Sequence, residues 1–218
     1  MTTSAPHRLT DLDALVSLLR DARREHPVDR RLIVGLVGAP GAGKSTVAAE
    51  LATRLDRIDP GATAVLPMDG FHLPQVELRR LGRRERMGAP DTFDVDGFID
   101  TLTRVAGTVG TVYAPGFDRT IEEPEPDAIT LAAEHRTVIV EGNYLLHDAH
   151  GWQHVAPLLD LSVAVDVDDS LRLERLVARH VAFGKSPVDA RAWSLGPDEV
   201  NARTIAATLH RADYVLEL

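Results

Sequence analysis

Residues 38–45 read Gly-Ala-Pro-Gly-Ala-Gly-Lys-Ser, which matches the pattern G-x-x-x-x-G-K-[ST] at every fixed position. In such a segment glycines let backbone N–H groups surround a phosphate, and the N-terminus of the following helix adds positive potential. Lys44 reaches the β- and γ-phosphates, and the Ser45 hydroxyl is a ligand for Mg2+. The segment predicts a nucleoside triphosphate site formed by Gly38, Ala39, Gly41, Ala42, Gly43, Lys44, Ser45 and Thr46.

The residues on either side of this segment fit the same interpretation. An apolar run at residues 32–37 precedes it, and apolar residues at helical spacing follow it between Val47 and Leu55. A phosphate-binding loop needs a strand before it and a helix after it. The alternative is a glycine-rich turn that matches the pattern by chance, and such a turn requires neither flank.

Two carboxylates directly follow predicted strands. Asp69 comes after the strand at residues 63–68, and Glu141 ends a valine-rich run. Because the carboxyl ends of parallel strands meet at one edge of a sheet, we expect Ser45, Asp69 and Glu141 to lie close together. There Asp69 is suited to act as a general base or to orient a hydroxyl group, and Glu141 is suited to a Mg2+ site. The alternatives are an aspartate that caps the turn at Gly70 and a solvated charge at a strand end.

Arginines form a second group of candidates. Arg172, Arg175 and Arg179 fall on one face of a helix predicted over residues 170–183. That face is either a phosphate clamp or a solvated basic surface. A clamp requires the face to turn toward the phosphate loop, whereas a solvated surface does not. The arginine cluster at residues 79–86 has the same two interpretations.

Alternating predicted strands and helices are available to position these residues. The predicted strands cover residues 32–37, 63–68, 111–113, 137–140, 161–167 and 214–216, and the predicted helices cover 9–25, 47–55, 95–105, 170–183, 187–193 and 197–209. Residues 88–94 are predicted to form a loop, and residues 122–127 a solvated connection. This order predicts the α/β class, with a three-layer α/β/α sandwich around a mainly parallel central sheet.

Composition limits the possible classes of protein. With 218 residues and 44% apolar content, we expect one domain over residues 1–218, in which residues 1–28 supply an N-terminal helix. A net charge of −9 and a pI near 5.4 argue against nucleic acid or an anionic membrane surface as partner. With no cysteine and no H-E-x-x-H pattern, the three histidines between residues 147 and 154 are expected at the surface rather than at zinc. We expect a cytoplasmic protein with no membrane association, and a homodimer is a possible assembly.

The motifs of this sequence, and their order, resemble those of the P-loop kinase superfamily that contains uridine kinase, phosphoribulokinase and type I pantothenate kinase. That superfamily also has bacterial nucleoside and sugar kinase-like members. Besides the phosphate loop, the motifs are Met-Asp-Gly-Phe-His at 68–72, Gly-Ala-Pro-Asp-Thr-Phe-Asp at 88–94, the segment 112–119, Val-Glu-Gly-Asn at 140–143 and Asp-Glu-Val-Asn-Ala at 198–202. The segment from Tyr113 to Arg119 departs from the Y-D-F-x-x-H-x-R pattern of uridine kinases. The resemblance therefore leaves the identity of the substrate open.

The resemblance implies a P-loop NTPase fold with a helical lid, over about residues 170–195, and it implies roles for particular residues. Asp69 is the implied catalytic base, with Lys44 and Arg175 also catalytic. Arg179 and Asn201 join the phosphate loop in binding the nucleotide. The residues implied to contact the acceptor are His72, Asp94, Tyr113, Arg119 and Glu141, and those implied at the metal are Ser45 and Glu141.

These interpretations together predict an enzyme. We expect an ATP- and Mg2+-dependent kinase that phosphorylates a hydroxyl group of a small metabolite such as a nucleoside, a sugar or a pantothenate-like compound. The alternative is a nucleotide-dependent switch or regulatory ATPase without a small-molecule acceptor. The sequence lacks the N-K-x-D segment that reads guanine, and the region around Asp69 favours the kinase.

Overall fold

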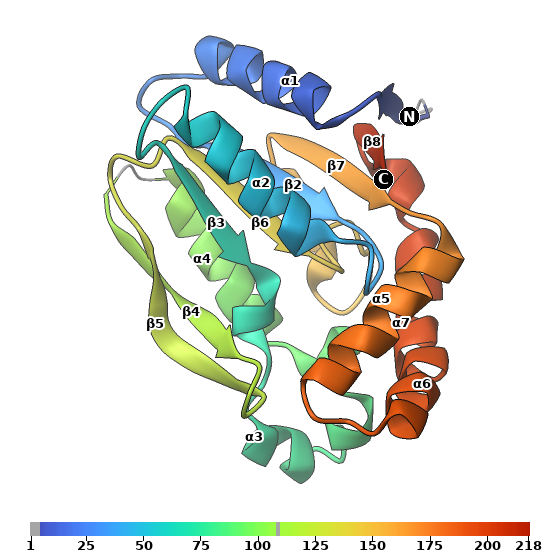
Figure 1. Ribbon diagram of the computed structural model, residues 1–218. Helices are drawn as coiled ribbons and strands as arrows, with labels where there is room; N and C mark the ends of the chain where they lie inside the picture. The colour runs from blue at the N-terminus through green and yellow to red at the C-terminus, as the bar shows by residue number, and fades with distance from the viewer. Residues whose placement is uncertain (1–4, 108–109) are drawn as a thin grey trace.

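The computed structural model describes residues 5–107 and 110–218 and is built around a six-stranded sheet (Figure 1). The strand order is β1-β8-β7-β2-β6-β3, and all five neighbouring pairs are parallel. Every residue of the neighbouring strands β2 and β6 is buried, which explains why both read as continuous apolar runs. The strands are β1 (His7–Leu9), β2 (Leu32–Val37), β3 (Thr63–Pro67), β6 (Thr137–Gly142), β7 (Leu161–Asp166) and β8 (Tyr214–Glu217).

Helices cover both faces of this sheet. Helices α1 (Leu12–Glu25) and α2 (Lys44–Asp56) pack on one face through Leu15, Leu19 and Leu51, and alternate strand residues complete that core. Helix α4 (Val95–Gly107) packs on the other face, where Phe98 joins Trp152 in a second core. The predicted three-layer α/β/α sandwich with a mainly parallel sheet is therefore confirmed.

The N-terminal segment differs from its prediction. The helix expected from residue 9 begins at Leu12, where the Asp11 carboxylate accepts a hydrogen bond of 2.8 Å from the Ala14 N–H. Residues before this cap form β1, which pairs with β8. Strand β1 has only three residues, too few for a period-2 pattern to be visible in the sequence.

The prediction for residues 111–127 was wrong in two respects. Strand β4 (Val112–Asp118) continues well past residue 113, and the expected solvated connection belongs to β5 (Glu123–Leu131), which pairs antiparallel with β4. The hairpin stands apart from the central sheet. Pro124 and Pro126 read as loop formers, but an edge strand tolerates residues that donate no backbone hydrogen bond. This hairpin also breaks the simple alternation of strand and helix.

The remaining helices lie beyond the carboxyl ends of the central strands. Helices α5 (Asp169–Ala182), α6 (Pro187–Leu195) and α7 (Pro197–Ala206) lie on one side, the β4–β5 hairpin on the other, and the short α3 (Gln75–Arg80) at the far end (Figure 1). Helix α7 ends three residues before its predicted limit, because residues 209–211 form a separate 3-10 turn. No helix in the described part of the chain is long and apolar enough to cross a membrane.

Candidate functional site

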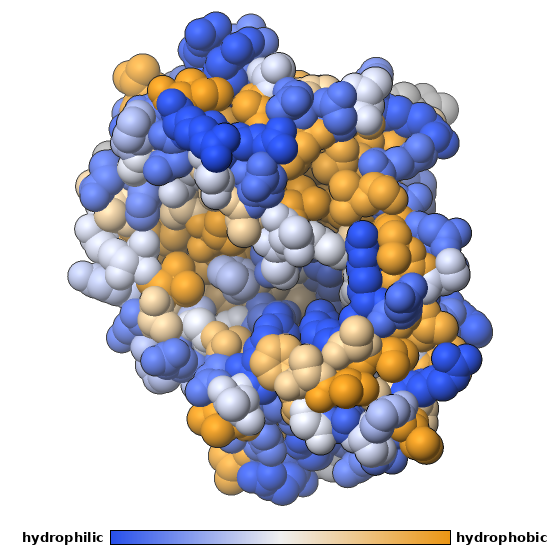
Figure 2. Space-filling model, in the orientation of Figure 1, coloured by the Kyte–Doolittle hydropathy of each residue, from blue (hydrophilic) through white to orange (hydrophobic). Residues whose placement is uncertain are grey.

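A cleft opens beyond the carboxyl ends of β2, β3 and β6, between the hairpin and the helices α5–α7. Figure 2 shows the surface hollowed in the middle of this face, with mostly hydrophilic residues around the hollow. Its lining combines residues that are far apart in the sequence, among them Lys44, Asp69, Arg119, Glu141 and Asp198. The topology thus brings the predicted chemical groups to one place, as expected for a parallel sheet.

The phosphate loop connects β2 to α2 and depends on backbone that only glycine adopts easily. Gly41 and Gly43 have φ angles of +84° and +91°. A Cβ on Gly41 would lie 2.6 Å from the backbone oxygen of Arg172, so this glycine also allows α5 to pack against the loop. Lys44 is 8% exposed and its Nζ donates a hydrogen bond of 3.1 Å to the Ala39 carbonyl. Burial lowers the pKa of Lys44 to about 8.

Ser45 and Glu141 meet at the base of the cleft. The Ser45 hydroxyl donates a hydrogen bond of 2.9 Å to Glu141 Oε1. Burial, and then the negative charge of Asp69, raise the pKa of Glu141. These oxygens fit Mg2+, which proteins hold through one or two carboxylates together with substrate phosphates. A cation there would offset the unfavourable burial of Glu141, so a Mg2+ site at Ser45 and Glu141 stays a prediction that these oxygens fit.

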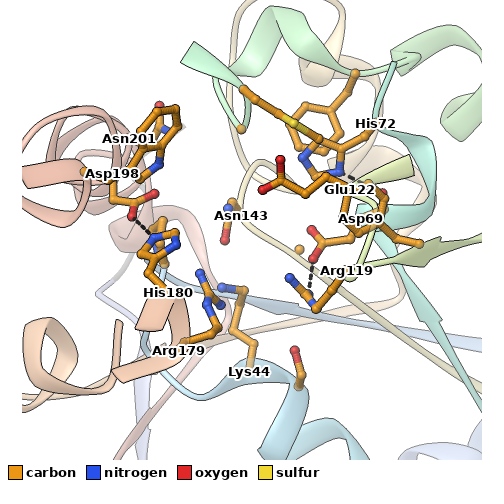
Figure 3. Close-up of a pocket in the computed structure, with 18 of the residues that line it drawn as sticks. Lys44, Asp69, His72, Arg119, Glu122, Asn143, Arg179, His180, Asp198 and Asn201 are labelled. Carbon is orange, nitrogen blue, oxygen red and sulfur yellow. Dashed lines mark hydrogen bonds and ion pairs between the residues drawn. The ribbon is translucent and has the colours of Figure 1, made fainter. Parts of the chain in front are cut away.

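Asp69 lies on the 3-10 turn Met68–Phe71 that follows β3. A Cβ on Gly70 would lie 2.0 Å from the Pro115 carbonyl oxygen, so the turn presses directly against the hairpin. The Asp69 carboxylate forms an ion pair with Arg119, and the two side chains face each other in Figure 3. Burial alone would raise the pKa of Asp69, but the charge of Arg119 helps to hold it below its usual value. Asp69 is thus a cleft carboxylate tied to Arg119 rather than a cap for Gly70.

The arginine face of α5 turns toward the phosphate loop. Arg175 and Arg179 line a second cavity together with Gly41, Gly43 and Thr46. Apolar side chains of Leu12, Phe183 and Leu218 line the same cavity. This placement favours the phosphate-clamp interpretation for Arg175 and Arg179.

Arg172, the third arginine of this face, has a different environment. It is 5% exposed, and its guanidinium donates hydrogen bonds of 2.9 Å to Asp169 and 2.7 Å to Glu199. Because Glu199 belongs to α7, Arg172 joins α5 to α7 instead of joining the clamp.

The predicted acceptor residues divide into two groups. His72, Arg119 and Glu141 line the cleft, and so does Asn201, which the family resemblance assigned to the nucleotide. His72 is held by a contact of 2.8 Å between its Nδ1 and the Asp69 backbone oxygen.

Asp94 and Tyr113 do not line the cleft. Asp94 Oδ1 accepts a hydrogen bond of 3.0 Å from the Gly97 N–H in the first turn of α4. Tyr113 is 53% exposed, because β4 turns the neighbouring Val112 and Ala114 inward. The structure therefore places neither side chain where the resemblance implied.

Several cleft residues were missing from the sequence-based prediction. On the α5–α7 side, His180 Nε2 lies 2.7 Å from Asp198 Oδ2, and Lys185 Nζ lies 4.7 Å from the centre of the Trp193 ring. On the opposite side Arg84 forms an ion pair with Glu122, and Met87, Phe93, Phe117 and Asn143 also line the cleft. The quoted motifs and the arginine cluster do contain several of these residues, namely Arg84, Phe93, Phe117, Asn143 and Asp198, but no pattern assigned their side chains to the cleft. Nothing in the spacing indicates that His180 faces Asp198.

Comparison with known proteins adds independent findings. A family model described as the phosphoribulokinase / uridine kinase family matches residues 33–190. A Schizosaccharomyces pombe protein provisionally named uridine kinase C227.14 is 33% identical over 197 residues, which cover 86% of this chain and 83% of that protein. The Escherichia coli protein YggC is 34% identical over 191 residues, covering 87% and 78%.

A solved structure extends the similarity to three dimensions. The crystal structure of a protein from Silicibacter sp. TM1040, provisionally named a fructose transport system kinase, superposes with a TM-score of 0.86 at 36% sequence identity. The match covers 96% of this chain and all of that one. The similarity therefore includes the hairpin and the helices α5–α7, which form the two sides of the cleft.

Proposed function

Because this chain belongs to the phosphoribulokinase / uridine kinase family of kinases, we propose that it transfers the γ-phosphoryl group of ATP to a hydroxyl group of a small polyhydroxylated metabolite. One observation carries the proposal. The Asp69 carboxylate lies in the same cleft as Lys44 and the Ser45–Glu141 pair, so a proton acceptor adjoins the phosphate-binding groups. A switch protein needs the phosphate loop but has no use for Asp69.

Each residue of the cleft then has a chemical task. Asp69 accepts the proton of the attacking hydroxyl, and its lowered pKa keeps it ionised and ready to do so. Lys44, Arg175 and Arg179 offset the negative charge on the transferred phosphoryl group. Arg119 lines both cavities, so it orients Asp69 while lying near the point of transfer. Mg2+, when bound by Ser45 and Glu141, supplies further positive charge at the phosphates.

The acceptor side of the cleft favours a molecule rich in hydroxyl groups. Arg84 and Glu122 form an ion pair there, and the Asp198 carboxylate is hydrogen-bonded to His180. The amides of Asn143 and Asn201 can donate and accept hydrogen bonds. Two of the relatives described above are named after uridine and after fructose, and each of these compounds carries several hydroxyl groups.

The test measures ADP release from ATP and MgCl2 with a panel of acceptors. The panel contains D-ribose, D-fructose, uridine, D-glycerate and pantothenate, and the phosphorylated product is identified by mass spectrometry. We expect at least one hydroxyl compound to stimulate ADP release and to gain one phosphoryl group. ADP release that is identical with and without every acceptor would favour the nucleotide-dependent switch instead.

A further inference from the structure

A histidine–carboxylate pair faces the cleft from the side opposite Asp69. His180 lies near the C-terminal end of α5, and Asp198 lies in the first turn of α7. The two side chains are only 17% and 11% exposed, and His180 Nε2 lies 2.7 Å from Asp198 Oδ2. In Figure 3 the His180 ring lies between Asp198 and the open cleft, whereas Asp69 and Arg119 lie across it.

The hydrogen-bonding role of each ring nitrogen follows from this contact. A carboxylate has no hydrogen to donate, so the Nε2–H of His180 must donate to Asp198. A neutral imidazole carries one hydrogen, and Nδ1 is then left with a lone pair that can only accept. No protein donor to His180 Nδ1 is found among the residues that the structure describes. The second nitrogen lies on the cleft side of the ring (Figure 3).

The position of His180 assigns it to the acceptor rather than to the nucleotide. His180 lines the cleft with Asp69, but it is absent from the lining of the cavity around Gly41, Gly43 and Arg175. The preceding residue, Arg179, lines both cavities. A molecule whose reacting hydroxyl lies at Asp69 therefore extends across the cleft toward the His180 ring.

We propose that His180, held in one tautomer by Asp198, accepts a hydrogen bond from a second, non-reacting hydroxyl group of the acceptor. The inference rests on the proposed kinase function and adds a specificity rule to it. The cleft selects acceptors that carry one hydroxyl for Asp69 and another, on the far side of the molecule, for His180. Loss of that second hydroxyl leaves the partly buried Nδ1 without a donor, which weakens binding more than it slows phosphoryl transfer.

The experiment compares acceptors that differ by one hydroxyl group. D-ribose is paired with 2-deoxy-D-ribose, uridine with 2′-deoxyuridine and 3′-deoxyuridine, and D-fructose with 1-deoxy-D-fructose. For the wild-type enzyme, we expect removal of one particular hydroxyl from an active acceptor to raise KM about tenfold and to change kcat by less than about twofold. His180→Leu should raise KM for the complete acceptor by a similar factor and should then be insensitive to that deletion.

A second variant and a control separate this role from a structural one. Asp198→Asn keeps the shape of the pair, but its amide can either accept from Nε2–H or donate to Nε2. It therefore no longer fixes Nδ1 as an acceptor and should weaken the same discrimination even where His180→Leu folds poorly. His26→Leu removes another histidine–carboxylate pair, with His26 Nε2 lying 3.3 Å from Asp160 Oδ1, away from the cleft. It should leave the KM ratios unchanged.

The outcomes distinguish the two proposals. In one outcome, removal of the hydroxyl group raises KM by the same factor in the wild type, His180→Leu and Asp198→Asn. That result would overturn the role of His180 and leave the kinase function intact. A wild-type enzyme that no acceptor stimulates would overturn the kinase function, and with it the specificity rule.

Discussion

The two sides of the reaction site are built in different ways. The donor side is a continuous loop between β2 and α2, shaped by glycine backbone and closed by the packing of α5 against Gly41. The acceptor side is assembled from separate segments that carry Asp69, Arg84, Arg119 and His180. Ion pairs hold Asp69, Arg84 and Arg119 in position, and a hydrogen bond to Asp198 holds His180. Backbone therefore determines the donor side, while side-chain partners determine the acceptor side.

This difference suggests how a kinase family can change its substrate. Substitution of one side chain on the acceptor side alters a contact but leaves the main chain in place. Substitution in the loop changes the backbone that every nucleotide must contact. Variants on the two sides should thus have separable effects on the nucleotide and on the acceptor.

The sharpest separation is expected from Asp69→Asn. Loss of the proton acceptor should lower kcat about 1000-fold, because general base catalysis contributes on that scale. Nucleotide affinity, measured by calorimetric titration of ADP, should change by less than about twofold. Asp100→Asn, on the exposed face of α4, is the control and should retain full activity. Equal losses of nucleotide binding and turnover in Asp69→Asn would remove the distinction between the two sides.

Gly41→Ala tests whether backbone shape governs the donor side. The positive φ and a Cβ only 2.6 Å from the Arg172 carbonyl should together cost about 2–3 kcal/mol, seen in the free energy of unfolding and in ADP affinity. Gly82→Ala is the matched control, because Gly82 has a φ of +66° but nothing lies within 4 Å of an added Cβ. Gly82→Ala should lower the free energy of unfolding by about 1 kcal/mol and leave ADP affinity unchanged. Equal effects of both variants would mean that close packing of α5 is unimportant.

Lys44 provides a pH test of the same side. Because its pKa is lowered to about 8, the ligand-free enzyme carries the Lys44 charge below that pH and loses it above. ADP affinity should therefore fall about twofold from pH 7 to 8 and then by up to about tenfold per pH unit. Lys44→Arg keeps its charge over this range, so its affinity, although weaker, should not fall. A decline of the same steepness in Lys44→Arg would assign the pH dependence to another group.

The smallest effect is expected on the acceptor side, from Arg84→Gln. Its ion pair with Glu122 is partly exposed, so its loss should raise KM for the acceptor only about threefold, with kcat and ADP affinity unchanged. Arg80→Gln removes the ion pair with Glu77 outside the cleft and serves as the control. An acceptor KM that responds equally to both substitutions would argue against a role for Arg84 in the cleft.

The sequence predicted the donor side of the reaction site better than the acceptor side. The phosphate loop, its flanking strand and helix, and the meeting of Ser45, Asp69 and Glu141 are all found in the structure. These features depend on local patterns and on the geometry of parallel strands. The prediction was wrong for β5, because its prolines and charges resemble a loop until β4 is present to pair with it.

Side-chain placement on the acceptor side was predictable only in part. Asp94 and Tyr113 belong to recognisable motifs, yet one caps α4 and the other faces outward from β4. His180 belongs to no motif, and its partner Asp198 lies 18 residues later on another helix. Such contacts depend on how α5 and α7 pack, which no local pattern encodes.

The amino-acid sequence by itself determined the donor side, because strand, glycine loop and helix are consecutive and each follows from short-range backbone preferences. It also determined that two carboxylates would meet the loop, because parallel strands end at one edge. Only the tertiary structure decided which side chains face the acceptor. Those side chains come from the hairpin and from α5–α7, and their positions depend on long-range packing and on charge pairs that exist only in the folded chain.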